Sequence, residues 1–77
     1  MTATAIRHNP VLGLPAAVRL QALPPEAKAA LVAVLRDIRS DAATRAEESW
    51  KRNKGPMAAY WKAVSVYALH ISRAVRS

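Results

Sequence analysis

Cations and aromatic side chains gather around one Gly-Pro pair in the segment "WKRNKGPMAAYWK" (residues 50–62). Cations attract phosphates, and neighbouring aromatic rings can stack on nucleic-acid bases. The same combination can hold an acidic protein surface, because aromatic anchors supply much of the affinity of protein interfaces. Further arginines follow toward the C-terminus. The candidate partner-binding residues are therefore Trp50, Lys51, Arg52, Lys54, Tyr60, Lys62, Arg73 and Arg76.

A purely structural role also explains this segment. Lys51, Arg52 and Lys54 would lie at the C-terminal end of a helix, where cations oppose the helix dipole and bind unpaired carbonyl groups. Gly55 suits the left-handed residue that ends a helix, and Pro56 suits the first turn of the next helix. The sequence leaves both interpretations open.

Side chains that could perform catalysis are present, but they are not grouped. His8 and His70 lie far apart and have no cysteine or acid at metal-ligand spacing. Asp37 and Asp41 are one helical turn apart and resemble a general acid–base pair only in number. No glycine-rich phosphate loop or nucleophile elbow occurs. We therefore expect a protein that is not an enzyme and that uses no metal or other cofactor.

The net charge of +7 is concentrated in the last third of the chain. Residues 24–49 contain four cations and five acids, whereas residues 50–77 contain six cations and no acid. Such a field attracts polyanions or acidic protein surfaces. The most apolar stretch, residues 57–75, contains Lys62, His70 and Arg73, so we expect no membrane span or membrane partner. The lack of cysteine fits a cytoplasmic location.

Apolar residues recur at intervals of three and four positions, and no strand-like alternation of useful length occurs, so we predict an all-α chain. We expect a small helical bundle with a short N-terminal arm and helix. Two longer antiparallel helices would follow, joined at Lys54-Gly55-Pro56. The single domain would comprise an arm over 1–14, a short helix over 15–23, and helices over 25–53 and 56–76.

The helix predicted over 25–53 is amphipathic in its first half only. Beyond Ala42 polar residues take the stripe positions, and a break near Ser40-Asp41 is an alternative, with Thr44 and Glu47 as a capping box. We favour a continuous helix because no Gly or Pro intervenes. Its apolar stripe would be Ala27, Leu31, Val34, Leu35, Ile38 and Ala42, and its ion pairs Asp41–Arg45, Glu47–Lys51 and Glu48–Arg52.

The helix predicted over 56–76 is apolar on more than one side. Val66 and Leu69 lie opposite its main stripe, and a helix that is apolar on two sides needs two neighbours. The first neighbour would be the helix over 25–53. The second would be the N-terminal arm, another copy of the chain or a target protein; we favour the first two and expect a homodimer. The main stripe is Met57, Trp61, Val64, Ala68, Ile71 and Val75.

The chain is similar in general character to small proteins of phages and mobile elements, in particular to the anti-CRISPR proteins. The resemblance covers the whole 77-residue frame, which lacks cysteine and enzyme motifs and ends in the basic "WKRNKGPMAAYWKAVSVYALHISRAVRS". That family has no shared motif, so no residue role is transferred. The resemblance implies binding to a CRISPR effector complex in the bacterial host cytoplasm and a block of its DNA capture. Many such inhibitors imitate DNA with acidic surfaces, which a chain of charge +7 cannot do.

Two hypotheses about function follow. The first is a non-enzymatic inhibitor that occludes a site on a larger host complex through residues 50–77. The alternative is a small nucleic-acid-binding accessory or regulatory protein of a mobile element, with the same cations on DNA or RNA phosphates. Because the cations after the Lys54-Gly55 turn are widely spaced, we would then expect phosphate contact rather than base recognition.

Overall fold

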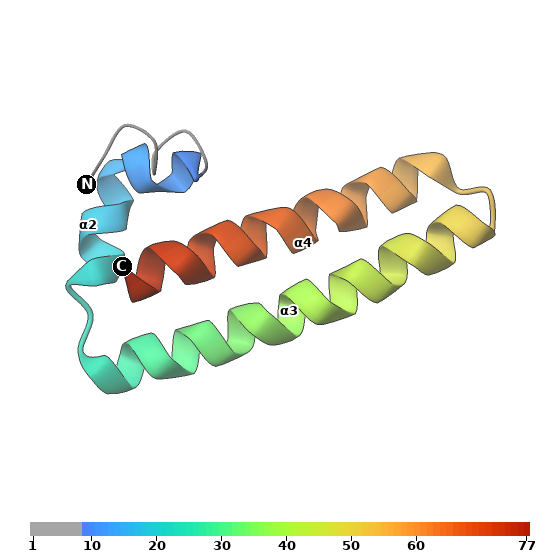
Figure 1. Cartoon of the computed structure of the whole chain (residues 1–77). Helices are drawn as coiled ribbons and strands as arrows, with labels where there is room; N and C mark the ends of the chain where they lie inside the picture. The colour runs from blue at the N-terminus through green and yellow to red at the C-terminus, as the bar shows by residue number, and fades with distance from the viewer. Residues whose placement is uncertain (1–8) are drawn as a thin grey trace.

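The computed structural model describes residues 9–77, and within them every regular element is helical. Helices α3 and α4 run antiparallel, side by side, while η1 and α2 lie against α4 near its C-terminal end (Figure 1). The predicted all-α architecture with two long antiparallel helices is confirmed. The elements are the 3-10 helix η1 (Pro10–Gly13) and the helices α2 (Pro15–Gln21), α3 (Pro25–Lys51) and α4 (Gly55–Arg76).

The N-terminal part of the chain differs in detail from the prediction. Residues 1–8 of the predicted arm lie outside the described residues, and residues 10–13 form η1 rather than irregular arm. Helix α2 ends at Gln21, two residues before the predicted end at residue 23, because Leu23 bonds its amide only to the Leu20 carbonyl, 3.3 Å away. Pro24 and Pro25 follow, and Pro25 opens α3 at a position where its missing N–H costs nothing.

Helix α3 is continuous through the position where a break was the alternative. Thr44 donates its hydroxyl to the Ser40 carbonyl oxygen at 3.2 Å, one turn back, instead of capping a new helix. Of the three predicted ion pairs only one forms, with Arg45 Nε 3.4 Å from Asp41 Oδ1. The prediction of the pairs Glu47–Lys51 and Glu48–Arg52 is wrong. Exposed side chains gain little free energy from such ion pairs, so they need not form.

The end of α3 corrects the role predicted for Gly55. Asn53 adopts the left-handed conformation, with φ 59°, whereas Gly55 has no positive φ and begins α4. The Asn53 amide bonds to the Trp50 carbonyl at 3.0 Å, and the Lys54 amide bonds to the Ser49 carbonyl at 2.8 Å. This pair of bonds is a Schellman motif, and asparagine tolerates its left-handed position better than most residues. Helix α3 therefore ends at Lys51, two residues before the predicted residue 53.

The core between α3 and α4 is narrow and consists mainly of small side chains. The buried apolar residues of these helices are Val32, Leu35, Ala42, Ala58, Ala68, Ala74 and Val75.

The predicted apolar stripes are therefore only partly buried. Leu35, Ala42, Ala68 and Val75 lie in the core, but Val34 and Ile38 remain 54% and 40% exposed. Ala27 and Met57 are exposed as well, whereas Val32, which the stripe omitted, is buried. Because α3 has one close neighbour along most of its length, it buries a strip narrower than its apolar surface.

The N-terminal arm is a second neighbour of α4, as one of the predicted alternatives proposed. Asn9 donates its side-chain amide to the His70 carbonyl oxygen at 2.8 Å, and Leu20 of α2 packs against the core cluster together with Leu31 and Ile71. The described part of the N-terminal segment, η1 and α2, lies against the C-terminal part of α4, so within residues 9–77 the rest of the hairpin is a single layer of helices (Figure 1). The molecule measures 42 × 28 × 15 Å, and the thinnest dimension is little more than one helix diameter.

Candidate functional site

The α3–α4 hairpin has two sides that differ in chemistry. On one side Ser65 donates its hydroxyl to the Arg39 carbonyl oxygen at 3.2 Å, and cavities there are lined by Ala43, Glu47 and Lys62. On the other side the Arg45 guanidinium lies 5.3 Å from the centre of the Trp61 ring. The cavity beside Arg45 and Trp61 shares no lining residue with those on the first side. The two sides are therefore separate surfaces.

The first side carries cations from both helices, and we call it the basic face. On α3 its members Lys28, Arg36 and Arg39 are separated by eight and three positions. On α4 its members Lys62, Arg73 and Arg76 are separated by eleven and three positions. Such intervals are close to whole numbers of helical turns, so the side chains project from the same side of each helix. The basic face consists of Lys28, Arg36, Arg39, Lys62, Arg73 and Arg76.

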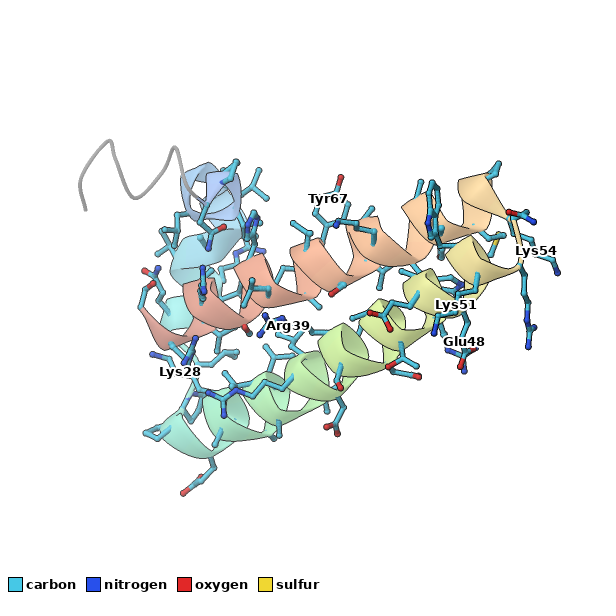
Figure 2. All side chains as sticks on the ribbon, turned by 45° about the vertical axis from the view of Figure 1, so that its right-hand side comes forward. Lys28, Arg39, Glu48, Lys51, Lys54 and Tyr67 are labelled. Atoms are coloured by element: carbon cyan, nitrogen blue, oxygen red, sulfur yellow. The ribbon has the colours of Figure 1, made fainter. Side chains whose placement is uncertain are left out.

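The antiparallel pairing joins cations that are far apart in sequence. Lys28 and Arg36 of α3 line one open cavity together with Arg76, the last residue of α4. Arg36 and Arg39 line the next cavity along α3. In Figure 2, Lys28 lies near the beginning of α3, and the Arg39 side chain reaches from the middle of α3 toward α4. These cations thus extend from the open end of the hairpin to its middle, and Lys62 continues the basic face toward the turn.

The acids of α3 lie mostly away from this face. Glu47 alone lines the cavities on the basic side, whereas Asp41 pairs with Arg45 on the other side. Glu48 lines the cavity beside Trp61 and is drawn near Lys51 at the hairpin end in Figure 2. Asp37 follows Arg36 directly and projects about 100° away from it around the helix. Helix α3 is nearly neutral as a whole, but its charges are sorted by side.

Trp50 extends the basic face toward the turn. Its side chain is 72% exposed and lines a groove of about 380 Å³ with Lys62. The floor of the groove is formed by the small residues Ala46, Gly55, Ala58 and Ala59. An exposed indole beside a cation, over an apolar floor, can stack on a flat ring or anchor a protein contact.

The residues predicted from the sequence do not form one corner. Trp50 and Lys62 share the groove on the basic side, and Lys51 is exposed at the hairpin end. Arg52 and Lys54 line the cavity beside Trp61 on the opposite side. Tyr60 meets Trp61 edge to face, with ring centres 5.1 Å apart.

Arg73 and Arg76 lie at the other end of the hairpin. Arg73 follows Lys62 by eleven positions, which corresponds to about 16 Å along α4. The structure therefore divides the predicted set among the turn, both sides and the open end.

The sequence interpretation missed Lys28, Arg36 and Arg39. These residues lie in the segment 24–49, whose net charge is close to zero, so a count of charge along the sequence did not select them. A signal was present: their spacing of eight and three positions places them on one side of a helix, away from Asp37 and Asp41. Their proximity to Arg76 required the pairing register of α3 and α4.

No protein-family model, curated protein or solved structure matches this chain. The resemblance to anti-CRISPR proteins consequently stays a prediction. Within residues 9–77 no three side chains of the metal-ligating types gather at one place, and no helix has the length and apolarity needed to cross a bilayer. The basic face is therefore the candidate site, on the strength of its geometry and charge.

Proposed function

We propose that this protein binds the phosphate backbone of a nucleic acid through its basic face. The observation that carries the proposal is the gathering of six cations, from two helices, on one side of the hairpin, where Glu47 is the one acid among the described residues that line the cavities. Five of the six are exposed and Lys28 is partly buried, so they can reach phosphates at little desolvation cost. Four are arginines, whose planar guanidinium groups bind phosphate oxygens with two hydrogen bonds at once.

The shape of the face favours binding that does not depend on base sequence. The cations of α4 span 14 positions, about 21 Å, and those of α3 span 11 positions, about 16 Å. That footprint covers several phosphates of a duplex, in which each strand carries one charge per about 3.4 Å of axis. Both helices lie side by side in the hairpin, so neither projects alone as a recognition helix that could enter the major groove (Figure 1). Phosphate contacts position a protein without reading sequence.

Salt dependence tests the proposal directly. We would titrate a labelled duplex and a labelled single strand by fluorescence anisotropy from about 50 to 300 mM salt, where counterion release is steep. For the duplex, log K should fall against log salt with a slope of about −3.6 to −4.5, which corresponds to four or five phosphate contacts at about 0.9 each. An absence of binding to both probes at the lowest salt would overturn the proposal.

Two variants of equal charge locate the binding surface. The triple variant Arg36→Ala, Arg39→Ala, Arg76→Ala removes three cations of the basic face, and its duplex slope should be shallower by about 3. The matched variant Lys51→Ala, Arg52→Ala, Lys54→Ala removes the same charge from the hairpin end, and its slope should change by about 1 or less. Equal losses in both variants would show that binding follows net charge alone, and would contradict the assignment to the basic face.

A second candidate function is occlusion of a site on a larger host protein complex, with a CRISPR effector as the partner that the resemblance implies. The exposed Trp50 beside its groove favours this candidate. A tryptophan that is exposed in the free protein and becomes buried on binding is a frequent anchor of protein interfaces. Trp50→Ala should then weaken capture of purified effector complexes at least tenfold, whereas binding to a duplex should change little. Capture that is unaffected by Trp50→Ala would remove this candidate.

A further inference from the structure

The side of the hairpin opposite the basic face exposes large apolar side chains, and we call it the apolar face. Val34 and Ile38 lie one turn apart on α3, on the same side as Arg45, and Tyr60 and Tyr67 lie seven positions apart on α4. The two tyrosines are 57% and 59% exposed, and Figure 2 shows Tyr67 extending from α4 away from α3. The apolar face consists of the exposed Val34, Ile38, Met57, Tyr60 and Tyr67 and the half-buried Val64.

We propose that a second copy of this chain covers the apolar face, so that two hairpins form a four-helix bundle related by a twofold axis. The proposal concerns a different surface from the basic face and does not depend on nucleic-acid binding. Antiparallel helical hairpins that pack face to face are a common route to four-helix bundles. In a twofold-symmetric dimer both copies contribute the same surface to the interface. The apolar face therefore needs to be complementary only to the same face of the second copy.

The thickness of the molecule is the first argument for a second layer. Stable domains consist of two or more packed layers around a core, whereas the greater part of this hairpin is one layer of helices, 15 Å thick in its thinnest dimension. Within residues 9–77, η1 and α2 do not supply the missing layer, because they lie against the C-terminal part of α4, where Asn9 bonds to His70 and Leu20 packs against the same cluster as Ile71. The core enclosed within one copy is mostly alanine and valine. Chains of this size often gain the missing burial by association.

The available area matches what a stable dimer needs. Helix α3 has 27 residues and is therefore about 40 Å long, and two helices side by side are about 20 Å wide. One side of the hairpin thus offers on the order of 800 Å² before the part beneath the arm is subtracted. A standard specific interface buries about 800 Å² on each partner. This side of the hairpin is therefore of the same order of size as one partner's share of such an interface, and its exposed side chains resemble the apolar centre of such interfaces.

Charge placement favours pairing of two copies through the apolar face over pairing through the basic face. Two chains of charge +7 repel each other, so they associate most readily through the surface that carries the least uncompensated charge. On this side Arg45 is paired with Asp41 and lies over the Trp61 ring, and nearer the turn Arg52 and Lys54 line a cavity together with Glu48. Three cations therefore face two acids here, against six cations and Glu47 on the basic side. The basic face lies on the other side, so it remains in solvent when the apolar faces meet. The side with fewer uncompensated cations is therefore also the more apolar of the two.

The first test is the mass of the full chain in solution, without nucleic acid. Sedimentation velocity from about 1 to 200 µM, a range in which weak dimers dissociate, should give a species of twice the 8.4 kDa chain mass at the upper end. A mass of 8.4 kDa at every concentration would overturn the proposal and leave the face to a protein of different sequence.

Matched variants show which face is used. Val34→Glu and Tyr67→Glu each place a charge in the proposed interface and should weaken dimerisation at least tenfold, while circular dichroism confirms that the helices persist. Val66→Glu is the control, because Val66 is 39% exposed and lines a cavity with Lys62 on the basic side. This variant should dimerise like the wild type. A dimer that survives the first two changes but is lost in Val66→Glu would contradict the proposal.

Chemical crosslinking tests the same interface without weakening the dimer. The chain contains no cysteine, so a single introduced thiol is the only crosslinking site. Ile38→Cys should give a covalent dimer with a short bifunctional maleimide, whereas Val66→Cys, on the opposite side of the hairpin, should not. Efficient crosslinking of Val66→Cys without crosslinking of Ile38→Cys would overturn the assignment of the face.

Discussion

Asn9 and His70 are joined by a 2.8 Å hydrogen bond from the Asn9 side-chain amide to the His70 carbonyl oxygen, across 61 positions of sequence. Asn9 is 6% exposed, and its main-chain carbonyl also accepts the Leu12 amide at 3.0 Å, so it both begins η1 and ties η1 to α4. This residue therefore helps to hold η1 against α4.

Replacement of Asn9 should loosen the arm. We expect Asn9→Ala to lower the free energy of unfolding by about 0.5–1.5 kcal/mol, the usual worth of one hydrogen bond, as measured by urea denaturation. Asn9→Asp should cost more, because it removes the amide donor and places a carboxylate beside the His70 carbonyl oxygen in a buried site. Wild-type stability in both variants would mean that the arm is not held by this bond.

The contact between Arg45 and Trp61 should contribute a small, measurable stabilisation. Arg45→Ala should lower the free energy of unfolding by about 0.5–1 kcal/mol, because the guanidinium 5.3 Å from the ring centre makes an exposed cation–π contact. Fluorescence would follow Trp61 alone in a Trp50→Phe background, since the chain has only two tryptophans. Arg45→Lys should lose part of this stabilisation. An emission spectrum of Trp61 that is identical in Arg45→Ala would argue against the contact.

The small side chains between α3 and α4 set how closely the helices approach. Ala68 is 4% exposed and packs in the cluster with Val32, Leu35 and Val75, so Ala68→Leu should overfill the core and cost about 1–3 kcal/mol. Ala33→Leu is the control, because Ala33 is exposed on α3, and its effect should stay within about 0.5 kcal/mol. Thermal unfolding of both variants against the wild type measures the difference. An Ala68→Leu variant as stable as the wild type would show that α3 and α4 pack less tightly around Ala68 than the structure indicates.

Two substitutions in the turn between the long helices should change the free energy of unfolding in opposite directions. Asn53→Ala should destabilise the protein by about 1–2 kcal/mol, because Ala is strained at φ 59°. Gly55→Ala should stabilise it by about 0.4–1 kcal/mol, since Gly55 has no positive φ and a Cβ there would meet no atom within 4 Å. Denaturant titration of the two variants gives both signs in one experiment. The reverse pattern would restore the role that the sequence suggested for Gly55.

Local signals predicted the elements well, because proline, glycine and three- and four-residue periodicity act over short distances. Pro15, Pro25 and Pro56 each lie in the first turn of a helix, as predicted. Local signals failed where two residues competed for one role: Asn53 took the left-handed position for which Gly55 had looked better suited.

The surface was harder to predict, because its composition depends on which sides of the helices meet. Val34 and Ile38 belong to the predicted stripe, yet they stay exposed because the apolar surface of α3 is wider than its contact with α4. Arg76 joins Lys28 and Arg36 only because antiparallel pairing brings the end of one helix to the start of the other. A count of charge along the sequence cannot contain that information. The predicted function and the predicted partner-binding set remain predictions.

The basic and apolar faces lie on opposite sides of one thin layer. A ligand held by the first cannot obstruct the second, and pairing through the second leaves a cationic surface on each outer side of the assembly. The paired protein would therefore be bivalent for polyanions, and it could bridge two nucleic-acid segments instead of coating one. Bridging raises apparent affinity through the local concentration of the second site. A chain kept monomeric by Val34→Glu would therefore bind a single short duplex normally but would fail to draw long DNA molecules together.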